Sequence, residues 1–203
     1  MLRYLGWVGR ATLCTALAGA AFAAPGETAA HASVAIAVSW EGLLEESSAA
    51  VIVTALEARA VWEDGRIYTY THVRVDRSVA GELTLGGDAW VRTMGGIVGK
   101  IGQVVEGEAA LIAGRSSLLF LHPGPVGAFE VTARAQGQFP VVSNDPKLPP
   151  YVVRGHAAGL IVRNAGNLAG RSNVLLAGEL LHGRSVDDAA REVTSAWNRT
   201  HAP

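Results

Sequence analysis

The chain has 203 residues, of which 17 are basic and 18 acidic, and aromatic residues make up only 6% of it. This near-neutral balance provides no electrostatic attraction to nucleic acid or to an anionic membrane surface, so we expect neither as a partner. Glycine is abundant, at 24 residues, which is typical of a turn-rich β protein built on aliphatic side chains.

The first 23 residues have the features of a secretory signal peptide. Two arginines come before or at the start of an apolar run of small residues, 11–24, that contains no acidic side chain. Ala21 and Ala23 then supply the small side chains that a signal peptidase requires. The run is shorter than the ~20 apolar residues that a membrane-spanning helix needs. We therefore expect cleavage between Ala23 and Ala24, and a secreted or periplasmic protein that does not span a membrane.

The only cysteine, Cys14, lies within this expected signal peptide. The residues before it, Ala11-Thr12-Leu13, do not form the motif of a lipid-anchored protein, which has leucine earlier and a small residue directly before the cysteine. Cleavage leaves 15 basic residues against the 18 acidic ones and no thiol. Without disulfides, a chain of roughly 180 residues must be stabilised by its hydrophobic core.

Two elements are expected before the first long strand. Residues 24–38 are rich in alanine and show no hydrophobic period, so we expect a flexible lead-in. Ser39 is a suitable N-cap for a short helix that extends to about Ser48. The apolar face of that helix would carry Trp40, Leu43 and Leu44.

The next two strands are expected to form a hairpin. An apolar strand begins at residues 51–55, and Asp64-Gly65 is a dipeptide that favours a tight β-turn. The returning strand, 67–76, alternates between two faces, which is typical of a strand with one buried side. Its polar face carries Tyr68, Tyr70, His72, Arg74 and Asp76.

Four further strands are expected after this hairpin. The first lies at residues 89–93, and the second, 118–121, is a continuous apolar run that indicates burial on both faces. Alternation predicts a third strand over 129–134. A fourth follows at 139–142, where Pro140 favours an edge position because proline has no N–H to donate.

The C-terminal part is expected to contain one strand and one helix. The strand lies at residues 160–163, and the helix runs from about Val186 to Arg199. Ser185 and Asp188 form a capping box at its start. Its apolar stripe, which we expect to dock on the β domain or on a partner, consists of Val186, Ala190, Val193 and Trp197.

These elements predict a mainly β fold. We expect a five-stranded, OB-like Greek-key barrel over residues 39–145 with short flanking helices, followed by a C-terminal extension, 146–203, that ends in a helix. The boundary is placed in the proline-rich segment 144–150. The main alternative is a β-sandwich, which needs about seven strands.

A pattern of strand and glycine motifs runs through residues 47–54, 67–75, 79–81, 95–99, 117–121 and 136–141. In this pattern the chain resembles a group of uncharacterised secreted bacterial proteins with a netrin-like OB-barrel domain, the type found in tissue inhibitors of metalloproteinases. It departs from that group at Gln138, where the group has lysine, and it lacks the disulfides of the animal modules. The resemblance implies the fold and carries no activity with it.

The glycine-dense segment 95–102 does not have the pattern of a phosphate-binding loop. Ile101 follows Gly99-Lys100 where such a loop requires serine or threonine, and no helix signal comes after it. A β-hairpin or bulge that needs glycines with positive φ explains the segment better. No cofactor is expected.

Neither the histidines nor the serines form a recognisable catalytic or metal-binding motif. No two histidines have the short spacing of a metal site. A triad of Ser116, His122 and Asp145 can be selected, but no nucleophile motif supports it. We therefore assign no catalytic, cofactor-binding or metal-binding residue. The six histidines are His31, His72, His122, His156, His182 and His201.

The polar face of strand 67–76 is the best candidate for binding. Its tyrosines, histidine and Arg74 are similar to the surface with which OB barrels bind single strands, although the charge balance opposes nucleic acid. The face could instead contact a protein or a glycan, or be covered by the C-terminal helix. We expect a secreted, non-enzymatic binding or accessory module with a protein, or a glycan, as its partner. The alternative is a hydrolase with dispersed site residues, which a pocket with converging titratable groups would favour.

Overall fold

The computed structural model describes residues 34–81, 87–155, 160–162 and 175–202, all within the unit Ala32–Pro203. The expected signal peptide lies outside these residues. Among the helices in the described ranges, none combines the length and the apolar character needed to cross a bilayer.

A long hairpin forms the centre of the sheet, as the sequence predicts. Strands β2 (Ala49–Glu63) and β3 (Arg66–Gly81) pair antiparallel along their length. Asp64 and Gly65 connect them with φ values of 48° and 76°, the left-handed geometry of a tight hairpin turn. Strand β4 (Asp88–Met94) pairs antiparallel with the other side of β3.

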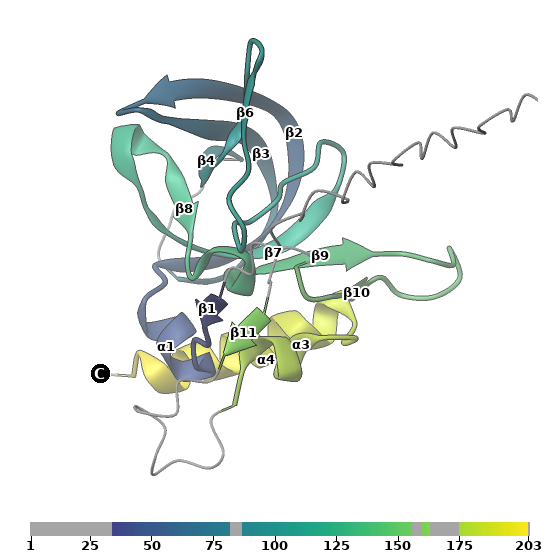
Figure 1. The fold of residues 1–203 in the computed structure, drawn as a ribbon. Helices are drawn as coiled ribbons and strands as arrows, with labels where there is room; N and C mark the ends of the chain where they lie inside the picture. The colour runs from purple at the N-terminus through teal and green to yellow at the C-terminus, as the bar shows by residue number, and fades with distance from the viewer. Residues whose placement is uncertain (1–33, 82–86, 156–159, 163–174, 203) are drawn as a thin grey trace, which may run out of the picture. The chain divides into compact units, whose positions relative to one another are not determined.

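Two more strands close a ring. Strand β7 (Ser116–Pro123) pairs antiparallel with β2 and also with β8 (Phe129–Val131), while β8 pairs parallel with β4. Each of the five strands β2, β3, β4, β8 and β7 therefore has a hydrogen-bonded neighbour on both sides (Figure 1). The expectation of five central strands is confirmed.

The sheet continues beyond the ring through β9 (Gln138–Val142) and β10 (Tyr151–Val152). The expected edge position of Pro140 is wrong, because β9 lies between β7 and β10. Proline has no N–H to donate, but its carbonyl can still accept a hydrogen bond. The Pro140 carbonyl accepts from the Val153 N–H at 2.9 Å, so proline is tolerated at this position.

A two-stranded sheet corrects the expected lead-in. Strand β1 (Val34–Ile36) falls inside the segment predicted to be flexible and pairs in parallel with β11 (Leu160–Val162), so the strand expected at 160–163 is confirmed. Three residues are too few to show a period in the sequence. Residues 24–33 lie outside the described ranges.

The strand expected over 129–134 ends early, at Val131. Ala133 and Arg134 both have φ of 55°, a left-handed conformation that cannot continue a strand. Short 3₁₀ turns lie before and after β8, at η1 (Pro125–Gly127) and η2 (Arg134–Gly137).

Strand β7 separates two hydrophobic clusters. Leu119 and Leu121 point into the ring, where they pack with Val51, Val73 and other apolar side chains. Leu118 and Phe120 point outward into a second cluster shared with the helices. All four are at most 1% exposed, which confirms the expected burial of this strand on both faces.

Three helices cover the outer side of β7 and its neighbours (Figure 1). Helix α1 (Trp40–Glu45) begins after the predicted cap Ser39, whose Oγ accepts from the Gly42 N–H at 2.9 Å. Helices α3 (Ala177–Leu181) and α4 (Val186–Thr200) complete the layer. The C-terminal helix therefore docks on its own domain, through Ala189, Ala190, Val193 and Ala196.

Loss of the cap of α4 should weaken this helical layer. Ser185 Oγ accepts from the Asp188 N–H at 3.1 Å, which is the N-cap bond of the predicted capping box. The Asp188 carboxylate accepts from the Ser185 hydroxyl at 2.6 Å. Ser185→Ala is expected to lower the free energy of unfolding by about 1 kcal/mol. Urea unfolding measures this, and Ser185→Thr, which keeps the hydroxyl, should stay close to the wild type. Equal losses in both variants would show that the cap bond is not the cause.

Candidate functional site

The helices leave one outer side of the ring uncovered, where β2, β3 and β4 lie next to each other. The α4 hydrogen bonds to β3 are made at Arg77 and Val79, beyond this surface, so of the alternatives left open for this face, coverage by the C-terminal helix is not the one observed. We call this surface the polar sheet face. It carries Arg59 and Glu63 from β2, Tyr68, Tyr70, His72 and Arg74 from β3, and Trp90 and Arg92 from β4.

Arg92 is the centre of a network on this face. Its Nε and Nη2 donate to Glu63 Oε2 at 3.2 and 2.8 Å, and its Nη1 donates to Glu130 Oε1 at 2.5 Å. The Tyr70 hydroxyl donates to Glu63 Oε1 at 2.6 Å. The guanidinium lies 3.4 Å above the centre of the Tyr68 ring, and the Arg92 side chain is only 11% exposed. These contacts hold the side chains in one arrangement.

The network shifts the acidity of its members. The hydrogen bond from Tyr70, followed by that from Arg92, lowers the pKa of Glu63 below its ordinary value. Burial and the bond to Glu63 raise the pKa of Tyr70. Burial opposes the charge on Arg92, but the bonds to Glu63 and Glu130 outweigh it and raise the pKa of Arg92. At neutral pH the site therefore contains an ionised Glu63, a neutral Tyr70 and a charged Arg92.

The acidity of Glu63 should change when the tyrosine hydroxyl is removed. Because the folded pKa of Glu63 is depressed, its stabilising contribution is present above the unfolded pKa and is lost as pH falls through the folded pKa. Tyr70→Phe is expected to raise the pKa of Glu63 towards its ordinary value, so the loss begins at a higher pH. Carboxyl NMR titration measures this. Tyr151→Phe is the control, because the Tyr151 hydroxyl accepts from Asn144 and does not contact Glu63 in this network. An unchanged pKa of Glu63 in Tyr70→Phe would contradict the assignment.

A pocket of about 300 Å³ opens on one side of the network. Trp90, which is 42% exposed, lines it. The ring of His72 stacks on Trp90 with centroids 4.9 Å apart and an interplanar angle of 24°, and His72 Nε2 lies 3.6 Å from Asp88 Oδ2. The remaining lining side chains are Arg59, Val61, Glu63, Tyr70 and Val126.

A second pocket, of about 390 Å³, lies on the other side of Arg92 and contains several titratable groups. His122 Nε2 is 3.6 Å from Glu130 Oε2, and its Nδ1 is 3.2 Å from Thr132 Oγ1. Burial raises the pKa of Glu108, although Arg134 Nε lies 3.8 Å from its carboxylate. The pocket thus brings converging polar groups from β4, β7 and β8 together.

The triad that can be selected from the sequence does not assemble. Ser116 and His122 occupy opposite ends of β7, roughly 20 Å apart along the strand. Ser116 Oγ lies 2.9 Å from Thr54 Oγ1, while Asp145 accepts from the Lys147 N–H in a turn.

Four of the six histidines lie within the described ranges. His72 and His122 belong to the two pockets, His182 accepts from the Arg154 N–H at 3.3 Å, and His201 stacks on Trp197 at 4.2 Å. His31 and His156 fall outside these ranges. Across the part of the chain that is described, no group of three or more His, Cys, Asp or Glu side chains could hold a metal ion.

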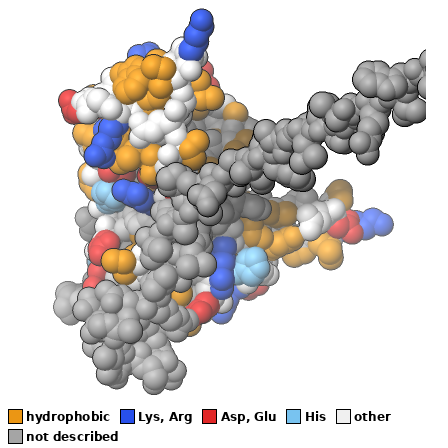
Figure 2. Space-filling model, in the orientation of Figure 1, with side chains coloured by type: hydrophobic (Ala, Val, Ile, Leu, Met, Phe, Trp, Pro, Cys, Tyr) orange, Lys and Arg blue, Asp and Glu red, His pale blue; other side chains and the backbone are white. Residues whose placement is uncertain are grey.

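The glycine-dense segment forms a hairpin, as predicted. Strands β5 (Gly96–Val98) and β6 (Ile101–Gln103) pair across Gly99 and Lys100, and Gly99 has φ of 62°. In Figure 2 the top of the molecule, where Figure 1 places this hairpin, shows a hydrophobic patch beside a basic side chain. Ile97 and Ile101 are the exposed hydrophobic residues of the hairpin.

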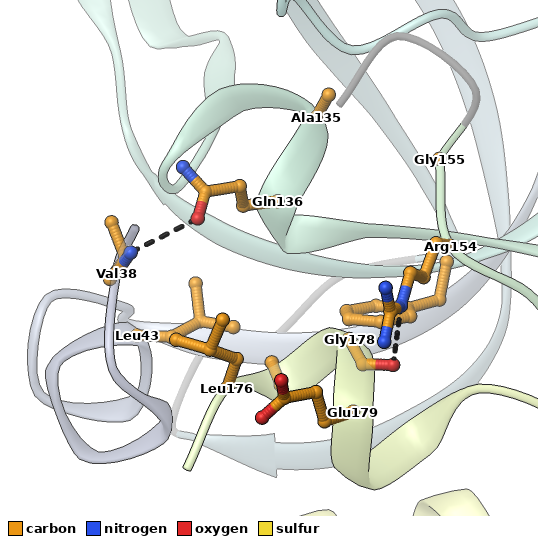
Figure 3. Close-up of a pocket in the computed structure, with 11 residues that line it drawn as sticks. Val38, Leu43, Ala135, Gln136, Arg154, Gly155, Leu176, Gly178 and Glu179 are labelled. Atoms are coloured by element: carbon orange, nitrogen blue, oxygen red, sulfur yellow. Dashed lines mark hydrogen bonds between the residues drawn. The ribbon is translucent and has the colours of Figure 1, made fainter. Parts of the chain in front are cut away.

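A third, smaller pocket lies between η2 and the helices (Figure 3). The Val38 N–H donates to Gln136 Oε1 at 3.0 Å, and Arg154 Nε donates to the Gly178 carbonyl at 2.8 Å. Its volume of about 50 Å³ is enough for only one or two water molecules, so it is not a site for a larger ligand.

Sequence reasoning found half of the polar sheet face. The alternation in β3 identified Tyr68, Tyr70, His72 and Arg74, but Trp90 and Arg92 were not singled out. Only the register of β3 against β4, which pairs Tyr70 with Arg92 and His72 with Trp90, brings them together.

Comparison with known proteins assigns no family to the chain. No protein-family model matches it, and no curated protein is similar to it in sequence. The function is therefore inferred from the chemistry of the site.

Proposed function

We propose that the chain is a secreted, non-enzymatic binding module that holds its partner on the polar sheet face. One observation carries this proposal: Arg92 is already bonded to Glu63 and Glu130, beside the exposed ring of Trp90. Side chains that are already paired with each other present donors and acceptors in fixed positions. This arrangement suits recognition, because these side chains lose little conformational entropy when a partner binds.

We also propose that the ring is an OB barrel of the netrin-like type. The strand order supports this: β7 pairs with β2, and β8 lies between β4 and β7, as in a five-stranded Greek-key barrel. In OB barrels the face of the second and third strands binds ligands. In this ring those strands are β3 and β4, which carry most of the polar sheet face.

Secretion is the most directly testable part of the proposal. The apolar run before Ala24 supports export and cleavage. N-terminal sequencing of the protein from its producing cells should give a start near Ala24. A protein that begins at Met1 would contradict it.

The binding face is tested by paired tryptophan variants. Trp62 is 48% exposed on β2 and lines neither large pocket, so it matches Trp90 in exposure but not in location. Immobilised wild type and Trp62→Ala should retain the same partner from the exported fraction of the producing cells, and Trp90→Ala should lose it. Retention by all three variants would place the binding site elsewhere.

A hydrolase is the second candidate, favoured by one observation. The two pockets contain carboxyl groups whose pKa values are displaced in opposite directions, lowered at Glu63 and raised at Glu108. Such pairs are typical of acid–base catalysis. Turnover of a peptide, ester or glycoside substrate that disappears in Glu108→Gln would favour the hydrolase over the binding module.

A further inference from the structure

The outer half of β2 has an open edge. Over residues 49–54 the strand lies between β3 and β7, but over 57–63 it pairs with β3 alone, and within the described ranges no other strand lies against its free side. Proteins usually block such an edge with proline or with charges that point inward. This segment contains no proline, and its side chains on the face of the buried Ile67, namely Ala58, Ala60 and Trp62, carry no charge. The edge can therefore accept a further strand.

Alternate residues of this segment present their backbone groups to the open side. Glu63 and Arg66 flank the two-residue turn and pair with each other, so they exchange both backbone hydrogen bonds, as the closing pair of a tight hairpin does. Such bonded pairs recur at every second residue of an antiparallel ladder. The residues between them, Ala58, Ala60 and Trp62, therefore direct their N–H and C=O groups away from β3.

The sequence of this edge is complementary to itself. When two copies pair antiparallel about a two-fold axis at Val61, Arg59 of each copy lies opposite Glu63 of the other, and Ala60 lies opposite Trp62. The charged pair attracts, and the small side chain leaves room for the large one. Ala60 and Trp62 are the residues with outward backbone groups, so they form the hydrogen-bonded pairs of this register. Trp62 is 48% exposed in the single chain, and packing on the second copy removes part of this apolar surface from water.

The charged groups of this edge are available for the contact. In the described part of the chain, the guanidinium of Arg59 has neither a hydrogen bond nor an ion pair. Glu63 Oε1 accepts from Tyr70 and its Oε2 from Arg92, and an ionised carboxylate can accept about four hydrogen bonds in all. A second copy therefore gives Arg59 a partner without breaking the network around Arg92.

Other registers of the same two strands are less favourable. An axis at Ala60 places Glu57 opposite Glu63, and an axis at Arg59 places the two copies of Arg59 opposite each other. Like charges directly opposite each other destabilise a strand pair. An axis closer to the turn shortens the paired segment. The register about Val61 is therefore the one that the sequence of the edge favours.

We infer that two copies of the chain pair antiparallel through residues 59–63 of β2, which joins β4, β3 and β2 of both copies into one continuous sheet. The inference goes beyond the proposed function, because it concerns the edge of β2, and β3 separates this edge from Trp90 on β4. The paired segment is short and buries a small area, so the dimer should be reversible, with a Kd in the micromolar range.

Sedimentation velocity of the full chain tests the inference across a concentration range that spans this Kd. The average mass of the wild type should rise towards that of a dimer. Arg59→Glu places carboxylates opposite each other and should weaken dimerisation about tenfold or more, whereas Arg59→Lys should dimerise nearly as well as the wild type. Lys147→Glu makes the same change of charge in the exposed turn between β9 and β10 and should have no effect. Thermal unfolding of each variant checks that it is folded.

Cysteine cross-linking tests the register. In a Cys14→Ser chain, Val61→Cys places two thiols opposite each other at the axis, where the Cα atoms of a pair without backbone bonds are about 4.5 Å apart, within the reach of a disulfide. Oxidised glutathione, which takes up the two electrons of the thiols, should convert this variant to a covalent dimer on a non-reducing gel. Glu57→Cys is the control, because the register separates its two copies by roughly 26 Å along the strands.

Failure of this inference is distinguishable from failure of the proposed function. A wild type that stays monomeric throughout the concentration range overturns the inference, and so does equal dimerisation of the wild type and Arg59→Glu or equal cross-linking of Val61→Cys and Glu57→Cys. Cross-linking of Val61→Cys only to a different exported protein would assign the edge to that protein and also overturn it. Trp90→Ala should dimerise like the wild type, so its loss of a partner tests the proposed function alone.

Discussion

Replacement of Phe120 by alanine is expected to lower the free energy of unfolding by about 3–5 kcal/mol. The side chain is fully buried in the cluster between the ring and the helices. Its ring makes edge contacts with Trp40 of α1 and Phe139 of β9, at centroid distances of 5.8 and 6.1 Å. Truncation removes these contacts and leaves a cavity between three elements, which the surrounding backbone can fill only in part.

Urea unfolding of matched variants measures this loss. Leu119→Ala should also be costly, by about 2–5 kcal/mol, because Leu119 points into the ring and is equally buried. Arg74→Ala removes only an exposed ion pair with Asp76 and should cost less than about 0.5 kcal/mol. If Phe120→Ala unfolds at the same urea concentration as Arg74→Ala, the outward side of β7 is not a packed core.

Gly81→Ala should destabilise the protein by about 3 kcal/mol or more. Gly81 has φ of 91°, a conformation that costs a residue with a side chain about 1–3 kcal/mol. An added Cβ would lie 2.3 Å from the Ser48 carbonyl oxygen and 2.7 Å from Ala49 Cα. Both are backbone atoms, so relief requires separation of the paired ends of β2 and β3, and this adds the cost of overpacking.

A second glycine isolates the steric contribution. Gly65 also has a positive φ, 76°, but an added Cβ would meet nothing within 4 Å. Gly65→Ala should therefore cost only the conformational strain, about 1 kcal/mol. Thermal or urea unfolding measures how much each variant lowers the free energy of unfolding. Equal decreases in the two variants would show that the backbone at Ser48 and Ala49 moves aside without an energetic penalty.

Features set by a few neighbouring residues were predictable from the sequence. The Asp64-Gly65 turn, the cap of α4 at Ser185 and the alternation of β3 each depend on local chemistry, and all three are confirmed. The expected end of the strand at Arg134 is wrong, because the backbone is left-handed at Ala133. A left-handed residue is usually signalled by glycine, and the sequence has alanine at that position. The edge position of Pro140 failed because the two-residue strand β10 was not predicted.

The site was predictable only where one strand supplied it. The polar face of β3 follows from alternation, but the central network joins Glu63, Arg92 and Glu130, which are far apart in the chain. Their contact depends on the antiparallel register of β3 and β4 and on the parallel pairing of Arg92 with Glu130. Neither pairing register can be read from the amino-acid sequence.

Closure of the ring also affects how the chain behaves at high concentration. A strand with partners on both sides offers few backbone N–H and C=O groups to a second molecule. In the seven-stranded sheet the outermost strand is β10, which has two residues and follows two prolines that cannot donate. At this end of the sheet, strand addition between molecules, a common route to fibrous aggregates, therefore meets a strand too short to serve as a template. The longer unpaired edge is the outer part of β2, where residues 57–63 pair with β3 alone.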